Sequence, residues 1–124
     1  MGDRGEVKVI QHSIDAPVYL YTHWGATYLC QTVANALERG RSRWDDPPYL
    51  TRIIFSDMIE DEVGETTGYG ISTRPGDVWR TVVVDCTLQK IIVQEHTLEY
   101  VGSGYEHGTD EKFYTFDDFI NEYE

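Results

Sequence analysis

The sequence has few basic residues and no long apolar run. Ten lysines and arginines stand against 22 aspartates and glutamates, so the formal net charge is −12. This excess of carboxylates repels the phosphates of nucleic acids, which excludes a general role in binding DNA or RNA. The longest apolar run is Val18 to Tyr21, whereas a membrane-spanning helix needs about 20 apolar residues. We therefore expect neither direct nucleic-acid binding nor a membrane span.

Cysteine is also scarce, with Cys30 and Cys86 as its two positions. They form no CxxC motif and have no histidine at metal-ligand spacing. Cys30 falls in a predicted helix and Cys86 at the end of a predicted strand, where free cysteines pack as small hydrophobes. The segment Met1 to Glu6 is charged and no apolar stretch follows it, which is unlike a secretory signal. We expect a cytoplasmic protein with two core thiols, although the sequence leaves a disulfide between them open.

The chain has 124 residues, of which 13% are aromatic and 26% charged. This length and balance fit one folded domain, residues 1–124, around a single core. Period-two alternation and β-branched runs predict strands at residues 6–12, 18–21, 66–73, 80–85, 89–94 and 97–101. Apolar spacings of three and four, with caps, predict helices at residues 26–39, 47–59 and 115–123.

The resulting order ββααββββα predicts an α+β domain, an antiparallel sheet with the helices packed on one face. The first two strands are expected to pair as a hairpin, and so are residues 80–85 and 89–94. Glycines at 68 and 70 suggest a bulge, or a place where another group approaches the backbone closely. The glycines from 102 to 108 indicate an exposed loop, in which Asp110 to Lys112 would also lie. Asp110 to Lys112 weakly resemble the acidic-x-Lys spacing of metal-dependent nucleases. Those enzymes present such residues from a strand, so a position in a loop argues against nuclease activity.

Two segments are candidates for holding a small anionic, nucleotide-like ligand. Around His23, Trp24 and Thr27 a predicted strand runs directly into a helix, whose free N–H groups suit an anion. Trp24 can stack on a ring there and His23 can donate a hydrogen bond. The alternative is that Trp24 only anchors the helix entry.

The second segment contains Arg43, Trp44 and Arg52, and arginine beside aromatic rings can bind phosphate and stack on a base. Alternatively, these arginines pair with nearby aspartates on the surface. Tyr69 can complete a pocket with either segment. The predicted ligand-binding residues are thus His23, Trp24, Thr27, Arg43, Trp44, Arg52 and Tyr69.

The acidic residues are distributed unevenly. Residues 95–124 hold nine carboxylates and one lysine, a net charge of −8. A further acidic run follows the second predicted helix, at the end where the helix dipole disfavours carboxylates. These features predict contacts with a partner protein that has a basic surface, although acidic residues also serve solubility alone. The predicted partner-binding residues are Glu60, Asp61, Glu62, Asp117, Asp118 and Glu122.

No set of catalytic residues is evident in the sequence. The histidines at 12, 23, 96 and 107 are scattered, and no hydrolase, metalloprotease or phosphate-loop motif is present. We therefore predict no catalytic residue, no metal and no cofactor, and an enzyme with a site assembled from scattered residues is the third alternative.

Four segments together resemble a family of short hypothetical proteins from bacteria and bacteriophages. They are residues 18–25 (VYLYTHWG), 36–47 (ALERGRSRWDDP), 49–55 (YLTRIIF) and 67–72 (TGYGIS). The resemblance covers residues 18–86 and implies a small phage or prophage accessory protein that binds a host component. The favoured function is thus non-enzymatic binding of a bacterial protein through an acidic surface, as an inhibitor or a mimic of nucleic-acid charge. The alternative is a module that binds or sequesters a nucleotide-like anion, and the sequence does not decide whether the protein forms a homo-oligomer.

Overall fold

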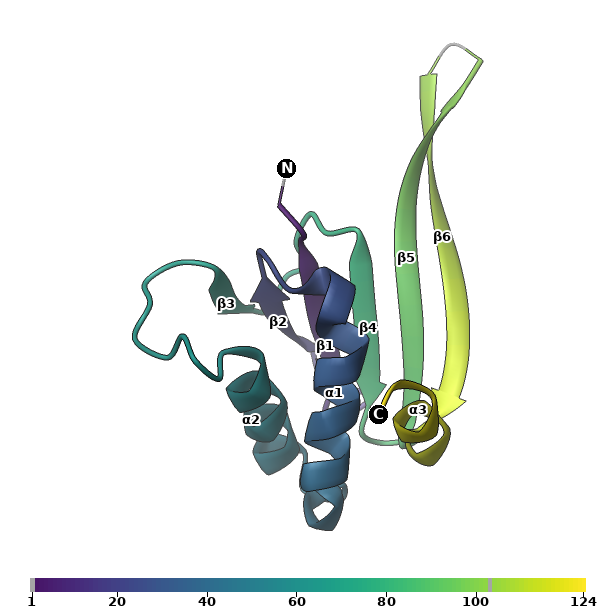
Figure 1. Ribbon diagram of the computed structural model, residues 1–124. Coiled ribbons are helices and arrows are strands. Elements are labelled where there is room, and N and C mark those ends of the chain that lie inside the picture. The colour runs from purple at the N-terminus through teal and green to yellow at the C-terminus, as the bar shows by residue number, and fades with distance from the viewer. Residues whose placement is uncertain (1, 103) are drawn as a thin grey trace.

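A computed structural model describes residues 2–102 and 104–124, with only the backbone described for residues 98–101 and 105–107 (Figure 1). The strands are β1 (Gly5–Ile10), β2 (Val18–Thr22), β3 (Tyr69–Ser72), β4 (Arg80–Asp85), β5 (Lys90–Val101) and β6 (Gly104–Thr115). The helices are α1 (Leu29–Arg39), α2 (Pro47–Met58) and α3 (Phe116–Tyr123), with short 3-10 turns η1 (Ala26–Tyr28) and η2 (Arg41–Arg43). The α+β class and the order ββααββββα are confirmed.

The six strands form one sheet in the order β3-β2-β1-β4-β5-β6. The predicted hairpins β1–β2 and β4–β5 are confirmed, and β2–β3 and β5–β6 are also antiparallel. β1 and β4 are parallel, with Gly5 opposite Arg80 and Ile10 opposite Asp85. The sheet is therefore mixed, because the chain passes through β2, both central helices and β3 before it returns to the free side of β1.

The core lies between the sheet and the three helices, which cover one face of it (Figure 1). Alternation along β1 turns Val7 and Val9 toward the helices, where both are fully buried. Each fully buried side chain of this size contributes about 1.5–3 kcal/mol of burial free energy. The other buried core residues of the sheet and the helices include Leu20, Leu29, Val33, Leu37, Leu50, Ile54, Val82, Val84, Ile91, Phe116 and Phe119.

The segment after Gly102 differs from the sequence prediction. Gly104–Thr115 is a strand rather than an exposed loop, and the two strands predicted at 89–94 and 97–101 are one strand, β5. β6 pairs with β5 along its whole length, from Val101 opposite Gly104 to Lys90 opposite Thr115. The glycines and charges of this segment have low β-propensity, but the long partner strand satisfies its backbone hydrogen bonds.

Candidate functional site

The structure places the predicted ligand-binding residues at opposite ends of helix α1. His23, Trp24 and Thr27 precede the helix, and Tyr69 lies opposite Thr22 on the neighbouring strand. Arg43 and Trp44 follow its other end, and Arg52 lies on α2, along with Tyr49. A helix of 11 residues is about 16 Å long. The two segments therefore do not form one pocket, and any ligand would have to bind at one end or the other.

The aromatic group before α1 is half open to solvent. The rings of His23 and Trp24 meet edge-on at 5.7 Å, and Trp24 meets Tyr69 at 6.2 Å. Trp24 is 51% exposed, and its ring lies against Gly68, where a Cβ would fall 1.9 Å from the ring. The close approach predicted at this glycine is therefore made by Trp24 itself.

The helix entry, where the sequence suggests an anion, already contacts a carboxylate. The backbone N–H of Thr27 donates to the Asp3 carboxylate at 2.9 Å, and the Trp79 indole N–H donates to its other oxygen at 2.8 Å. Burial raises the pKa of Asp3, but these hydrogen bonds and Arg80 outweigh it and lower the pKa below its ordinary value. Asp3 thus occupies the place that an anionic ligand would need.

In the second predicted segment, Trp44 and Arg43 contact other side chains and the backbone of the domain. Trp44 packs edge-on against Phe116 at 5.0 Å and donates its indole N–H to the Leu37 carbonyl at 2.9 Å. Arg43 lies over the Tyr49 ring at 4.8 Å and reaches Asp46 at 3.8 Å. These contacts give Trp44 and Arg43 structural roles, while Arg52 is exposed on α2.

The predicted partner-binding carboxylates form two separate surfaces. Glu60, Asp61 and Glu62 follow the C-terminal end of α2, whereas Asp117, Asp118 and Glu122 lie on α3. Helix α1 lies between α2 and α3 (Figure 1). Of these six residues, Asp117 accepts from Arg41 at 2.8 Å, and Glu62 is only partly exposed, with one carboxylate oxygen buried. A single partner would therefore contact one of these surfaces or span α1.

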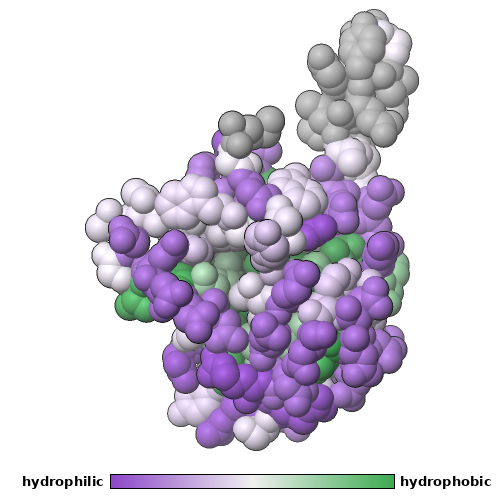
Figure 2. Space-filling model, viewed as in Figure 1, coloured by the Kyte–Doolittle hydropathy of each residue, from purple (hydrophilic) through white to green (hydrophobic). Residues whose placement is uncertain are grey.

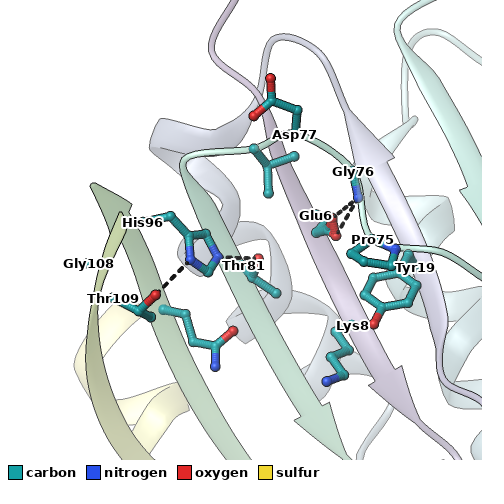
Figure 3. A pocket seen from close by; sticks show the side chains of 12 residues that line it. Glu6, Lys8, Tyr19, Pro75, Gly76, Asp77, Thr81, His96, Gly108 and Thr109 are labelled. Carbon is teal, nitrogen blue, oxygen red and sulfur yellow. Dashed lines mark hydrogen bonds between the residues drawn. The ribbon is translucent and has the colours of Figure 1, made fainter. Parts of the chain in front are cut away.

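A cavity that the sequence did not predict lies on the face of the sheet that the helices leave open (Figure 3). It has a volume of about 410 Å³, and residues 75–78 of the loop between β3 and β4 cover one side. Its size falls in the range of small-molecule sites, roughly 300–1,000 Å³. The polar side chains that line it are Glu6, Lys8, Tyr19, Asp77, Thr81, Gln94, His96 and Thr109.

Glu6 is the most buried charged residue of this cavity. It is 1% exposed, and its carboxylate accepts the Gly76 N–H at 2.7 Å (Figure 3). Burial raises the pKa of Glu6, against the opposing effects of that hydrogen bond and of Lys8. Lys8 follows on the same face of β1, yet across the described residues Glu6 has no ion-pair partner within 4.0 Å. A carboxylate can accept several hydrogen bonds, so Glu6 retains capacity for a donor.

His96 forms the other side of the cavity and is held by two threonines. Its Nε2 lies 2.9 Å from the Thr81 hydroxyl, and its Nδ1 lies 3.2 Å from the Thr109 hydroxyl (Figure 3). A neutral imidazole donates through one nitrogen and accepts through the other, so these contacts engage both. The arrangement places a threonine hydroxyl, rather than a serine or cysteine side chain, beside the imidazole.

This cavity could not be predicted from the sequence, because its residues come from five strands and a loop. The available signal was the alternation of Glu6 and Lys8 with Val7 and Val9, which identifies a polar face but not the loop that folds over it.

Within the described ranges, His, Cys, Asp and Glu nowhere gather in a group of three or more that could bind a metal. Across the same ranges, none of the helices combines the length and apolar character that spanning a bilayer requires. No family model, curated protein or solved structure matches the chain.

Proposed function

We propose that this chain is a non-enzymatic binding protein that docks on a basic surface of a bacterial protein. The net charge of −12 attracts basic partners over roughly 8 Å at physiological salt. Five of the seven arginines form ion pairs within the domain, which leaves few cations to offset the free carboxylates. The paired arginines are Arg4, Arg39, Arg41, Arg43 and Arg80.

The carboxylates after α2 carry this proposal. Glu60, Asp61 and Glu65 are exposed, and none of them has an ion-pair partner among the residues that the structure describes. Val63, in the same loop, is 73% exposed, which adds an apolar contact amid the charges. Figure 2 shows that the helical side of the molecule is covered mainly by hydrophilic side chains. Protein interfaces combine such apolar contacts with a polar rim.

The setting in bacteria rests on the resemblance of residues 18–86 to short bacterial and phage proteins. A phage accessory protein with this charge would act as an inhibitor, or as a mimic of nucleic-acid charge, on a protein whose own surface is basic. Acidic side chains on a folded surface present negative charge to a basic partner without a phosphate backbone.

A pull-down from bacterial lysate at low and high salt tests the proposal. We expect the native protein to retain a partner at low salt and to release it at high salt, because screening weakens charge pairing. The triple variant Glu60→Gln, Asp61→Asn, Glu65→Gln should lose that partner. A control variant on α3, Asp118→Asn with Glu122→Gln, should retain it. Absence of a salt-sensitive partner, or equal retention by all three proteins, contradicts the proposal.

A small ligand in the sheet-face cavity is a second candidate function, supported by Glu6 and Lys8. Opposite charges two residues apart on one face of a strand lie roughly 7 Å apart and can hold the two ends of a zwitterion. The mixed charge of this cavity fits such a ligand better than the nucleotide-like anion that the sequence suggests. Native mass spectrometry of freshly purified protein, beside Glu6→Gln and Lys8→Met, tests this. A bound mass lost on denaturation and missing from both variants supports the site, whereas the bare chain mass in all three counts against it.

A further inference from the structure

Strand β6 forms one edge of the sheet. It pairs with β5 on one side, and the order of strands ends with it. The side chains of residues 108–115 are described, and most of them are exposed. Helix α3 follows β6 and packs on the inner face of the sheet rather than along this edge (Figure 1). β6 is 12 residues long and the opposite edge strand β3 is four, so β6 offers the longer row of unpaired backbone groups.

Two backbone hydrogen bonds establish which groups of β6 face outward. The His96 N–H donates to the Trp79 carbonyl, on the β4 side of β5, and the Phe116 N–H donates to the Gln89 carbonyl. Because N–H and C=O groups alternate in direction along a strand, odd-numbered residues of β5 face β6. The register pairs these with even-numbered residues of β6, such as Lys112 opposite Val93. The backbone groups of Thr109, Glu111 and Phe113 therefore point away from the sheet.

Along the described part of this edge, two exposed carboxylates outnumber one exposed lysine, Lys112, which favours a basic occupant. Asp110 and Glu111 are exposed, and neither has an ion-pair partner within the described part of the chain. Phe113 is 69% exposed on the open face of the sheet, where it can cover an apolar side chain of an added strand. A second copy of the chain fits poorly, because each copy carries a charge of −12 and like charges across an interface are unfavourable.

We infer that the bacterial partner adds an extended, basic segment to the edge of β6 as a seventh strand. This inference rests on the proposed function and names how the partner binds. Main-chain hydrogen bonds to Thr109, Glu111 and Phe113 supply affinity, and the carboxylates of Asp110 and Glu111 select lysine or arginine side chains. The carboxylates of the loop after α2 provide a second, separate contact with the same partner.

Amide hydrogen exchange of the full chain tests the geometry directly. In the free protein the N–H groups of Glu111 and Phe113 should exchange fast, and those of Lys112 and Tyr114 slowly. Binding of the partner recovered in the pull-down should protect Glu111 and Phe113 without altering the pattern at β3. Slow exchange at Glu111 and Phe113 in the free monomer, or no protection in the complex, overturns strand addition.

Proline at an outward-facing position provides the matched mutational test. Phe113→Pro removes an unpaired N–H, which edge strands tolerate, whereas Phe113→Ala removes the ring and keeps the N–H. We expect Phe113→Pro to bind the recovered partner about tenfold more weakly than Phe113→Ala. Equal binding of the two variants, together with salt-sensitive capture by the native chain, overturns strand addition and leaves the proposed function standing. Absence of any salt-sensitive partner overturns both, and a native dimer that Phe113→Pro dissociates assigns the edge to a second copy instead.

Discussion

The Glu6 carboxylate accepts the backbone N–H of Gly76 at 2.7 Å, across 70 positions of sequence. This bond holds the loop before β4 over the open face of the sheet, and the same loop leaves Glu6 1% exposed. Glu6 therefore holds in place the loop that forms one wall of the cavity, and the same loop buries Glu6.

Substituting Glu6 by Gln should change how stability depends on pH. Burial raises the pKa of Glu6 in the folded state, so the folded chain holds its proton to a higher pH than the unfolded chain does. Stability from this group is complete below the unfolded pKa and is lost as pH rises through the folded pKa. Gln keeps an oxygen for Gly76 and does not ionise. Urea unfolding at about pH 4 and about pH 8 should therefore show that the native protein loses stability relative to Glu6→Gln as pH rises. A constant difference between the two proteins would refute this.

Replacing Gly68 by Ala should destabilise the domain. Gly68 has φ +94, and an added Cβ would fall 1.9 Å from the Trp24 ring. Left-handed backbone at a non-glycine residue alone costs about 1–3 kcal/mol, and the collision adds to it. Gly64→Ala is the control, because a Cβ there meets nothing within 4 Å. Thermal unfolding should show a lower Tm for Gly68→Ala and little change for Gly64→Ala; equal Tm values would show that Trp24 moves away freely.

The tryptophans at 24 and 44 should behave differently in solution. Trp24 is 51% exposed, so acrylamide should quench its fluorescence readily, and Trp24→Phe should remove most of the quenchable signal. Trp44 donates to the Leu37 carbonyl at 2.9 Å, and Trp44→Phe should cost about 1–2 kcal/mol of unfolding free energy through the lost hydrogen bond and packing. The prediction fails if Trp44→Phe is as stable as the native chain and Trp24→Phe is not.

Both thiols should be unreactive in the native protein. Cys30 is 1% exposed and Cys86 is 7% exposed, and burial raises the pKa of Cys86 to about 11. The reactive species is the thiolate, so a thiol reagent at neutral pH should modify neither residue until denaturant is added. Rapid labelling of one equivalent without denaturant would place Cys86 at a mobile edge of the core.

The elements with strong periodicity were predictable from the sequence. The residues at which these helices and strands begin and end follow from local side-chain and backbone properties. β4 begins at Arg80 and ends at Asp85, as its β-branched run indicates, and α3 starts after Thr115, whose hydroxyl accepts the Asp118 N–H at 3.1 Å. β3 is shorter than predicted because the positive φ of Gly68 ends the extended segment before Tyr69.

The rest depended on contacts between distant segments. Gly104–Thr115 becomes a strand through its pairing with β5, which the local composition of β6 does not reveal. The spatial separation of Trp24 from Trp44 follows from the length of α1 between them, whereas the sequence left open whether their two segments contribute to one pocket. Glu6 becomes buried through a loop 70 positions away, so its environment cannot be derived from its neighbours in sequence.

The parallel pairing of β1 with β4 bears on how the chain is made. Gly5 pairs with Arg80, so during synthesis one side of the first strand has no partner until residue 85 has left the ribosome. Long-range parallel pairing is slow because the loop must close before contacts stabilise it. Until then β1, β2 and β3 can pair while the hydrogen-bonding groups of β1 stay open, which makes this nascent state the stage most exposed to aggregation and to chaperones.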